Sequence, residues 1–167
     1  YWTDPSPNLR SLGAALLYAG VAMLEYSPSY SVGRGTDAPF EQIGADWIDG
    51  RRLAAHLASR YIPGVRFYPT RFCPTASHFA GQCIEGVRFL VTDREAFSAS
   101  RLGVEIAAAL ATLHPEKLSL EANARLIGNR RTLDALAKGE EPRLIHQADQ
   151  DGVAAFLTAR EEFLLYR

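Results

Sequence analysis

Apolar residues spaced three and four apart predict a helix near the start of the chain, over residues 9–18, with Asn8 as its N-cap. The apolar run that follows, residues 21–26, predicts a short buried strand. A second amphipathic pattern predicts a helix over residues 50–60, capped by Asp49. The first third of the chain is therefore expected to alternate between helix and strand.

Two further strands are expected before the middle of the chain. One begins at Val65 and runs to about Tyr68, where Pro69 limits it to a sheet edge or to an early end. The other covers residues 87–91, between Gly86 and a polar turn, and has the clearest strand pattern. These strands supply the sheet of the predicted fold.

Helical patterns fill the second half of the chain. A long helix is expected from Ser98 to about His114, where Pro115 stops it, and it is followed by shorter helices near residues 120–126 and 129–138. A last helix runs from residue 150 or 151 to about 165, and its apolar side chains are expected to pack inward: Val153, Phe156, Leu157 and Phe163. We predict one domain over residues 1–167, a mixed β-sheet packed with several helices, of the α/β class with α+β as the alternative.

Composition adds limits to this picture. The chain has 167 residues, 47% hydrophobic and 22% charged, as in an ordinary globular protein. Its formal net charge of −1 gives no basic surface of the kind that nucleic acid or an anionic membrane attracts. No apolar run is long enough to span a bilayer. The turn-rich opening at Tyr1 resembles the end of a linker, so we expect a processed chain or a piece of a larger protein.

The two cysteines, Cys73 and Cys83, flank a segment that contains Pro74 and Gly81. A hairpin there would bring the thiols together, and a disulfide bond would suit an exported protein. Two buried free thiols are an equally ordinary interpretation, and the spacing does not match a metal-binding pattern.

The segment from Ser31 to Glu41 is the strongest local signal of chemistry. Arg34 lies between Gly33 and Gly35, and Thr36 follows. Glycine lets the backbone turn sharply and approach a ligand, and a guanidinium binds carboxylate or phosphate through paired hydrogen bonds. We therefore predict an anion-binding loop to which Thr36 adds a hydroxyl donor. The alternative is a structural role in which Arg34 caps a helix or pairs with a carboxylate of its own loop.

Two acidic residues flank this loop. Glu25 follows an apolar run, at the expected end of a strand, where carboxylates often face a cleft; it is also a candidate partner for Arg34. Glu41 is a candidate acceptor for a sugar hydroxyl, or a residue in the first turn of a helix. A pair of glycosidase acids drawn from Glu25, Asp37 and Glu41 would need a separation that a sequence does not reveal.

A second polar loop contains His78, Phe79 and Gln82. Hydroxyl partners beside an apolar ring suit a carbohydrate, so we include His78 and Gln82 among the candidate binding residues. The chain lacks the G-x-S-x-G elbow and the glycine-rich nucleotide motifs, and its histidines lack the spacing of a zinc site. Neither a catalytic residue nor a metal or organic cofactor is predicted.

Taken together and in order, several segments resemble one known family. They are Pro5–Asn8, Ser31–Glu41, Ile43–Asp49, Pro63–Phe67, Phe79–Cys83, Val91–Arg94 and Phe163–Tyr166. The chain resembles the C-terminal domain of the exo-β-N-acetylmuramidases, the NamZ or YbbC-like glycoside hydrolases of bacterial peptidoglycan recycling. The Gly-Arg-Gly-Thr loop with its Pro-Phe-Glu tail is the most specific part of the resemblance.

The resemblance implies a two-domain enzyme that releases N-acetylmuramic acid from a non-reducing end. A Rossmann-like N-terminal domain would carry the catalytic glutamate, and this chain would help to form the substrate cleft and be inactive alone. It also implies a periplasmic or secreted protein. The rival interpretation is a stand-alone, non-catalytic module that binds a cell-wall sugar or another anion; a third is a self-contained hydrolase using Glu25 and Glu41.

Overall fold

A computed structural model describes residues 3–166 of the chain. The elements, in chain order, are α1 (Leu12–Val21), η1 (Ala22–Leu24), β1 (Gln42–Ala45), α2 (Gly50–Ser59), β2 (Val65–Phe72), β3 (Ile84–Val91), α3 (Ala99–Leu113), η2 (Glu121–Asn123), α4 (Ala124–Ile127), α5 (Arg130–Ala137), α6 (Pro142–Ala148), α7 (Gln150–Arg160) and η3 (Glu161–Phe163). Within the described residues this confirms a sheet combined with helices and a helix-rich second half.

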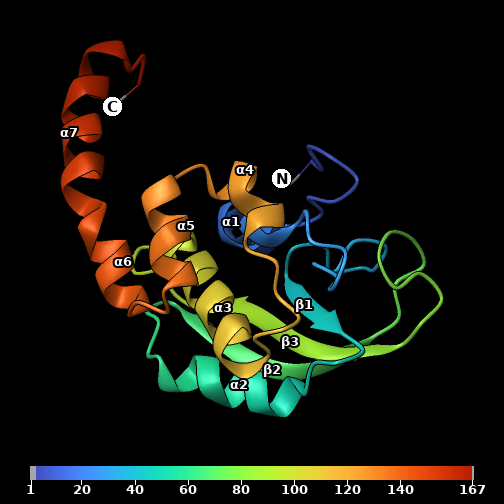
Figure 1. The fold of residues 1–167 in the computed structure, drawn as a ribbon. Helices are drawn as coiled ribbons and strands as arrows, with labels where there is room; N and C mark the ends of the chain where they lie inside the picture. The colour runs from blue at the N-terminus through green and yellow to red at the C-terminus, as the bar shows by residue number, and fades with distance from the viewer. Residues whose placement is uncertain (1–2, 167) are drawn as a thin grey trace.

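The sheet described within residues 3–166 has three strands in the order β1–β3–β2, and both neighbouring pairs are antiparallel, so the sheet is antiparallel and not mixed as predicted. Helix α2 packs along β2 and β3, whereas α1 and α3 pack against each other (Figure 1). Because β2 is an edge strand, it accommodates Pro69, and it continues to Phe72, beyond the predicted end.

Strand β1 was not predicted, because it is short and contains a glycine. All four of its residues are buried. Gly44 pairs with Gly86 of β3, and a Cβ atom on Gly86 would lie 1.9 Å from the carbonyl oxygen of Ile43. The close pairing of β1 and β3 therefore requires glycine at position 86.

The predicted strand over residues 21–26 is wrong. Val21 ends α1, and the 3₁₀-helix η1 follows. A short, continuous apolar run does not distinguish a buried helix from a buried strand, which explains the error. Glu25 is consequently the C-cap of η1 and not the end of a strand.

Helices α3, α4 and α5 confirm the patterns in the second half, whereas α6 was not predicted. The prediction for the last helix is wrong in two respects. Helix α7 ends at Arg160 and is followed by η3, and it contains no buried residue. The side chains that were expected to pack inward are exposed: Val153, Phe156, Leu157 and Phe163.

The core lies between the sheet and the helices. Its fully buried side chains include Leu17 of α1, Phe89 of β3 and Leu110 of α3. Among the helices described for residues 3–166, none has the length and apolar character needed to cross a membrane.

Candidate functional site

The loop around Arg34 is built on its two glycines. Gly33 and Gly35 have φ angles of +82° and +80°, in the left-handed region that favours glycine. A Cβ atom on Gly33 would lie 2.6 Å from the carbonyl oxygen of Ala38, and one on Gly35 would lie 2.4 Å from that of Ala76. Gly33 thus folds the loop onto itself, and Gly35 admits the backbone of a second loop.

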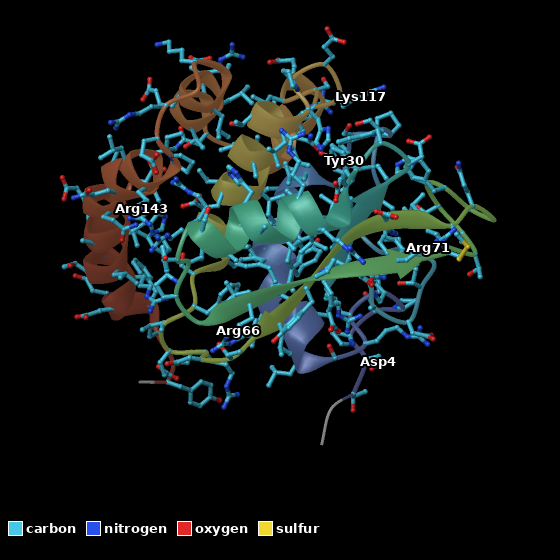
Figure 2. The ribbon with its side chains drawn as sticks, turned by 90° about the horizontal axis from the view of Figure 1, so that it is seen from below. Asp4, Tyr30, Arg66, Arg71, Lys117 and Arg143 are labelled. Atoms are coloured by element: carbon cyan, nitrogen blue, oxygen red, sulfur yellow. A yellow bond between two sulfur atoms is a disulfide. The ribbon has the colours of Figure 1, made fainter. Side chains whose placement is uncertain are left out.

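This second loop, residues 73–83, connects β2 to β3 and is docked onto the first. The backbone N–H and the hydroxyl of Thr75 both donate to the carbonyl oxygen of Gly35, at 2.8 Å each. A disulfide bond joins Cys73 to Cys83, as one of the two sequence interpretations predicted. Figure 2 shows this bond in yellow at the tip of the β2–β3 hairpin, near Arg71.

The two loops and the end of η1 surround a pocket of about 230 Å³. Its lining residues are Glu25, Tyr26, Val32, Arg34, Ser77 and His78. Three residues singled out in the sequence, Glu25, Arg34 and His78, therefore meet at one place.

Arg34 is both ion-paired and accessible. Its Nη1 donates to Oε1 of Glu25, yet 43% of its side chain remains exposed, against 15% for Glu25. A guanidinium carries several N–H donors, so one hydrogen bond to Glu25 leaves others for a ligand. The pairing with Glu25 is confirmed. The carboxylates of Arg34's own loop have other partners, since Asp37 pairs with Arg10 and Glu41 with Arg88.

Other predicted site residues have structural roles. The hydroxyl of Thr36 donates to the carbonyl oxygen of Gly33 at 2.6 Å and accepts from the side-chain Nε2 of Gln42. Its single proton is therefore used in a hydrogen bond within the loop. Thr36 is therefore not the ligand donor that was predicted. Gln82 is exposed and does not line the pocket; its backbone N–H donates to the carbonyl oxygen of Phe79.

Glu41 lies at a different place. It accepts hydrogen bonds from Ser11 and Arg88, at 2.5 and 2.7 Å, and lines a pocket of about 540 Å³ between α1 and the end of β3. Because Glu25 and Glu41 line separate pockets, the structure does not support a hydrolase that uses these two carboxylates as a pair.

Tyr26 was missed as a site residue. The residue is 56% exposed and lines the pocket, whereas Phe79, the expected aromatic surface, packs against the core. The available signal was an aromatic residue next to a candidate acid. It was overlooked because residues 21–26 were interpreted as a strand.

A buried asparagine holds Tyr26 in place. Asn123 accepts from the backbone N–H of Tyr26 and donates to the hydroxyl of Tyr30, each at 3.0 Å. Burial raises the pKa of Tyr30 to about 12, so its hydroxyl stays neutral in this contact at ordinary pH. As for metals, among residues 3–166 no group of three or more His, Cys, Asp or Glu side chains converges as a metal site would require.

Comparison with known proteins places this chain in a family. The model of the family described as exo-beta-N-acetylmuramidase NamZ, C-terminal, matches residues 16–166. The chain belongs to this family. Peptidoglycan beta-N-acetylmuramidase NamZ of Bacillus subtilis (strain 168) is 32% identical over 165 residues, which are 97% of this chain and 40% of that protein.

A solved structure supports the fold of this NamZ C-terminal domain. A DUF1343 family protein from Bacteroides fragilis NCTC 9343 superposes with a TM-score of 0.76 at 21% identity, over 99% of this chain and 45% of that one. The chain thus spans less than half the length of both proteins. The NamZ match includes the Arg34 loop, the disulfide-bonded loop and the C-terminal residues up to 166.

Proposed function

We propose that this domain forms part of the substrate cleft of a peptidoglycan-processing exo-β-N-acetylmuramidase, and that the Arg34 pocket binds the terminal N-acetylmuramic acid. The observation that carries the proposal is the guanidinium of Arg34, which is fixed by Glu25 and still accessible in a pocket that Tyr26 and His78 also line.

The chemistry of the sugar matches this pocket. N-acetylmuramic acid differs from N-acetylglucosamine by a lactyl ether that ends in a carboxylate. A guanidinium beside that carboxylate forms a charge-assisted hydrogen bond, whose loss costs about 1.5–3 kcal/mol. A difference of this size corresponds to roughly a tenfold to hundredfold preference for the acidic sugar.

The neighbours of Arg34 supply the remaining recognition. The exposed ring of Tyr26 offers an apolar face for a pyranose ring, and its hydroxyl offers a polar end. His78 and Ser77, from the disulfide-bonded loop, add polar side chains to the lining. The pocket thus contains a cation, an aromatic face and hydrogen-bonding groups, which a charged sugar requires.

Hydrolysis itself requires groups that this pocket lacks. Glycoside hydrolysis proceeds through an oxocarbenium-like transition state and uses two carboxyl groups, whereas Glu25 is the single carboxylate of the pocket and is ion-paired. Both matched proteins are more than twice as long as the region that this chain covers. As the family resemblance implies, we propose that the principal catalytic acid lies in a Rossmann-like N-terminal domain of the same protein, and we expect the 167-residue chain alone to be inactive.

The disulfide bond supports an oxidising location for the working protein. Such bonds persist in exported proteins and are rare in reducing compartments. We propose that the enzyme acts outside the cytoplasm, where peptidoglycan lies. Fractionation of the native cells would test this proposal, because recovery of the protein with cytoplasmic markers alone would contradict it.

Titration calorimetry tests the sugar specificity. The 167-residue chain should bind N-acetylmuramic acid at least about tenfold more tightly than N-acetylglucosamine, and Arg34→Ala should remove most of this preference. Arg88→Ala is a matched control, since Arg88 is 40% exposed and pairs with Glu41, which is 15% exposed. Equal loss of affinity for both sugars in Arg34→Ala would contradict the proposal.

A non-catalytic binding module is the competing function, because the pocket has groups suited to binding a sugar and lacks a pair of carboxyl groups for hydrolysis. The full product of the reading frame that contains this chain should release N-acetylmuramic acid from a chromogenic glycoside. Sugar binding without such turnover by the full product would establish the module and contradict the enzyme.

A further inference from the structure

The C-terminal arm, residues 150–166, is the most apolar exposed part of the described chain. It consists of α7, η3 and the residues after them. Its large exposed apolar side chains are Val153, Phe156, Leu157, Phe163, Leu164, Leu165 and Tyr166. In Figure 1 the arm runs along one end of the molecule, opposite the loop that carries the disulfide bond, and Figure 2 shows the same separation.

The composition of α7 does not suit a helix in water. Residues 153–159 contain one polar side chain, Thr158, and its hydroxyl donates back to the carbonyl oxygen of Ala154 at 3.2 Å. A helix that is apolar on all sides is normally buried, and a helix of only 11 residues is marginal in water without tertiary packing. The arm therefore requires a covering that residues 3–149 do not supply.

An open groove adjoins the arm. Its volume is about 770 Å³, and its lining includes Val153 and Phe156 of α7, apolar residues of the body such as Met23 and Val104, and polar residues such as Arg131. The groove and the exposed side chains of α7 are continuous, so one apolar surface could cover both.

The family match indicates what covers them. It extends to residue 166, so the arm belongs to the NamZ C-terminal domain and is not an unrelated tail. The matched region is 40% of the Bacillus subtilis relative and 45% of the Bacteroides fragilis chain, and the family description places it at the C-terminal end. In the Bacillus subtilis NamZ the larger part of the polypeptide therefore precedes this domain.

We propose that the arm is an interdomain docking surface, covered by an apolar face of the polypeptide that precedes this domain. This proposal rests on the two-domain organisation in the proposed function. It adds that α7 and η3 hold the two domains together, at a place remote from the Arg34 pocket. The preceding domain would then contact this one at the arm as well as beside the Arg34 pocket, where the proposed function requires its catalytic acid.

Hydrogen exchange tests the docking directly. The 167-residue chain is compared with the full product of the reading frame that encodes it. We expect backbone amides of residues 150–163 to exchange at least about tenfold more slowly in the full product. Equal exchange in both proteins, or a reading frame that encodes no preceding domain, would overturn the proposal.

A substitution with a matched control identifies the surface. Phe156→Asp should lower the melting temperature of the full product by roughly 5 °C more than Leu144→Asp does, but should have no larger effect in the 167-residue chain. Phe156 and Leu144 are 63% and 61% exposed in this domain, so they differ mainly in whether they lie on the arm. Equal effects of the two substitutions in the full product would contradict docking at α7.

Two other outcomes are distinguishable. If the 167-residue chain forms a dimer that Phe156→Asp dissociates, and the full product gives no added protection, the covering is a second copy and the proposal is wrong. If the arm is protected in the full product but the chain does not bind N-acetylmuramic acid, the proposed function fails and the interdomain surface stands.

Discussion

At the scale of single residues, the central feature is Arg34, whose guanidinium pairs with Glu25 and also lines the pocket. Glu25 orients the guanidinium of Arg34 through one hydrogen bond. The same carboxylate places a negative charge near any acidic ligand. We therefore regard Glu25 as a positioning residue with two opposed effects. Its hydrogen bond orients Arg34 for binding, and its negative charge weakly repels an acidic ligand.

Glu25→Gln separates these two effects. The amide oxygen can still accept from Arg34, while the negative charge is removed, so affinity for N-acetylmuramic acid should rise by about twofold to fivefold at low salt. The gain should shrink as salt is added, because the removed repulsion is screened. Titration at two ionic strengths measures both. A loss of affinity beyond about tenfold would show that the carboxylate itself contacts the sugar.

Gly35 connects backbone conformation to the pocket. Gly35→Ala introduces a residue at φ +80° and places its Cβ 2.4 Å from the carbonyl oxygen of Ala76. We expect a loss of about 1–3 kcal/mol in the free energy of unfolding and weaker sugar binding, because the disulfide-bonded loop must move away.

Gly81→Ala is the matched control for this substitution. Gly81 has a φ of +79°, but a Cβ atom there would have no neighbouring atom within 4 Å, so the alanine meets only the backbone strain. Urea denaturation and sugar titration of both variants give the comparison. If both variants lose equal stability and both keep full affinity, the contact between Gly35 and Ala76 does not support the pocket.

His114 predicts a pH dependence of stability. Burial is the main cause that lowers its pKa below the ordinary value of 6.5, and Arg52 adds to the shift while Asp49 opposes it. Its ring contacts Trp47, and its Nε2 atom is buried with no hydrogen-bond partner among the described residues. Below pH 6.5 the unfolded chain takes up the proton more readily, so stability falls until the pH is below the folded-state pKa.

His114→Phe keeps a ring beside Trp47 and removes the titrating group. Its melting temperature should therefore fall less than that of the wild type between about pH 7 and pH 5. His146, whose pKa burial also lowers, continues to titrate in both proteins and leaves the comparison unchanged. Thermal unfolding at several pH values measures the difference, and parallel curves would contradict the role of His114.

At the scale of elements, the loop between β2 and β3 contributes two of the six residues that line the pocket. Its closure by Cys73–Cys83 and its contact with Gly35 together hold Ser77 and His78 in the pocket with Arg34. We therefore expect the disulfide bond to support the proposed binding pocket as well as the fold.

Removing this bond tests that role. The double variant Cys73→Ser, Cys83→Ser should lose about 2–3 kcal/mol of stability, as expected for a short closed loop, and should bind N-acetylmuramic acid several-fold more weakly. Denaturant unfolding and calorimetry at a temperature where the variant is folded measure the two effects. Unchanged affinity in the folded variant would show that the loop does not contribute to binding.

Sequence patterns predicted the elements that have long periodic signals. The helices predicted over residues 50–60 and 98–114 match α2 and α3. In both, apolar residues recur at helical spacing and a polar N-cap marks the start, and this combination indicates a helix and not a strand. Residues 21–26 and β1 were misjudged, because a short apolar run has no period and a glycine-containing strand has little β-propensity. The exposure of α7 could not be predicted, since an apolar pattern does not reveal what will cover it.

The site was predictable as a set of residue types and not as an arrangement. Arg34 between two glycines indicated an anion site, and the structure brings it together with Glu25 and His78. Thr36, Glu41 and Gln82 lie in the same or nearby loops, yet their side chains are directed to other partners or away from the pocket. Side-chain direction depends on the tertiary contacts of each loop, which a linear sequence does not encode locally.

At the scale of the whole molecule, we propose different roles for the two ends of this domain. The apolar arm lies at one end, opposite the disulfide-bonded loop whose residues Ser77 and His78 line the Arg34 pocket (Figure 1). This division fits a NamZ C-terminal domain within proteins more than twice its length. It also means that substrate binding and domain docking can be altered independently.

The most direct test of the account is the structure of this chain with N-acetylmuramic acid bound. We predict that the lactyl carboxylate lies within hydrogen-bond distance of the Arg34 guanidinium, with the sugar ring against Tyr26. A sugar bound beside Glu41 instead, or bound at Arg34 with its carboxylate directed away from the guanidinium, would contradict the central claim.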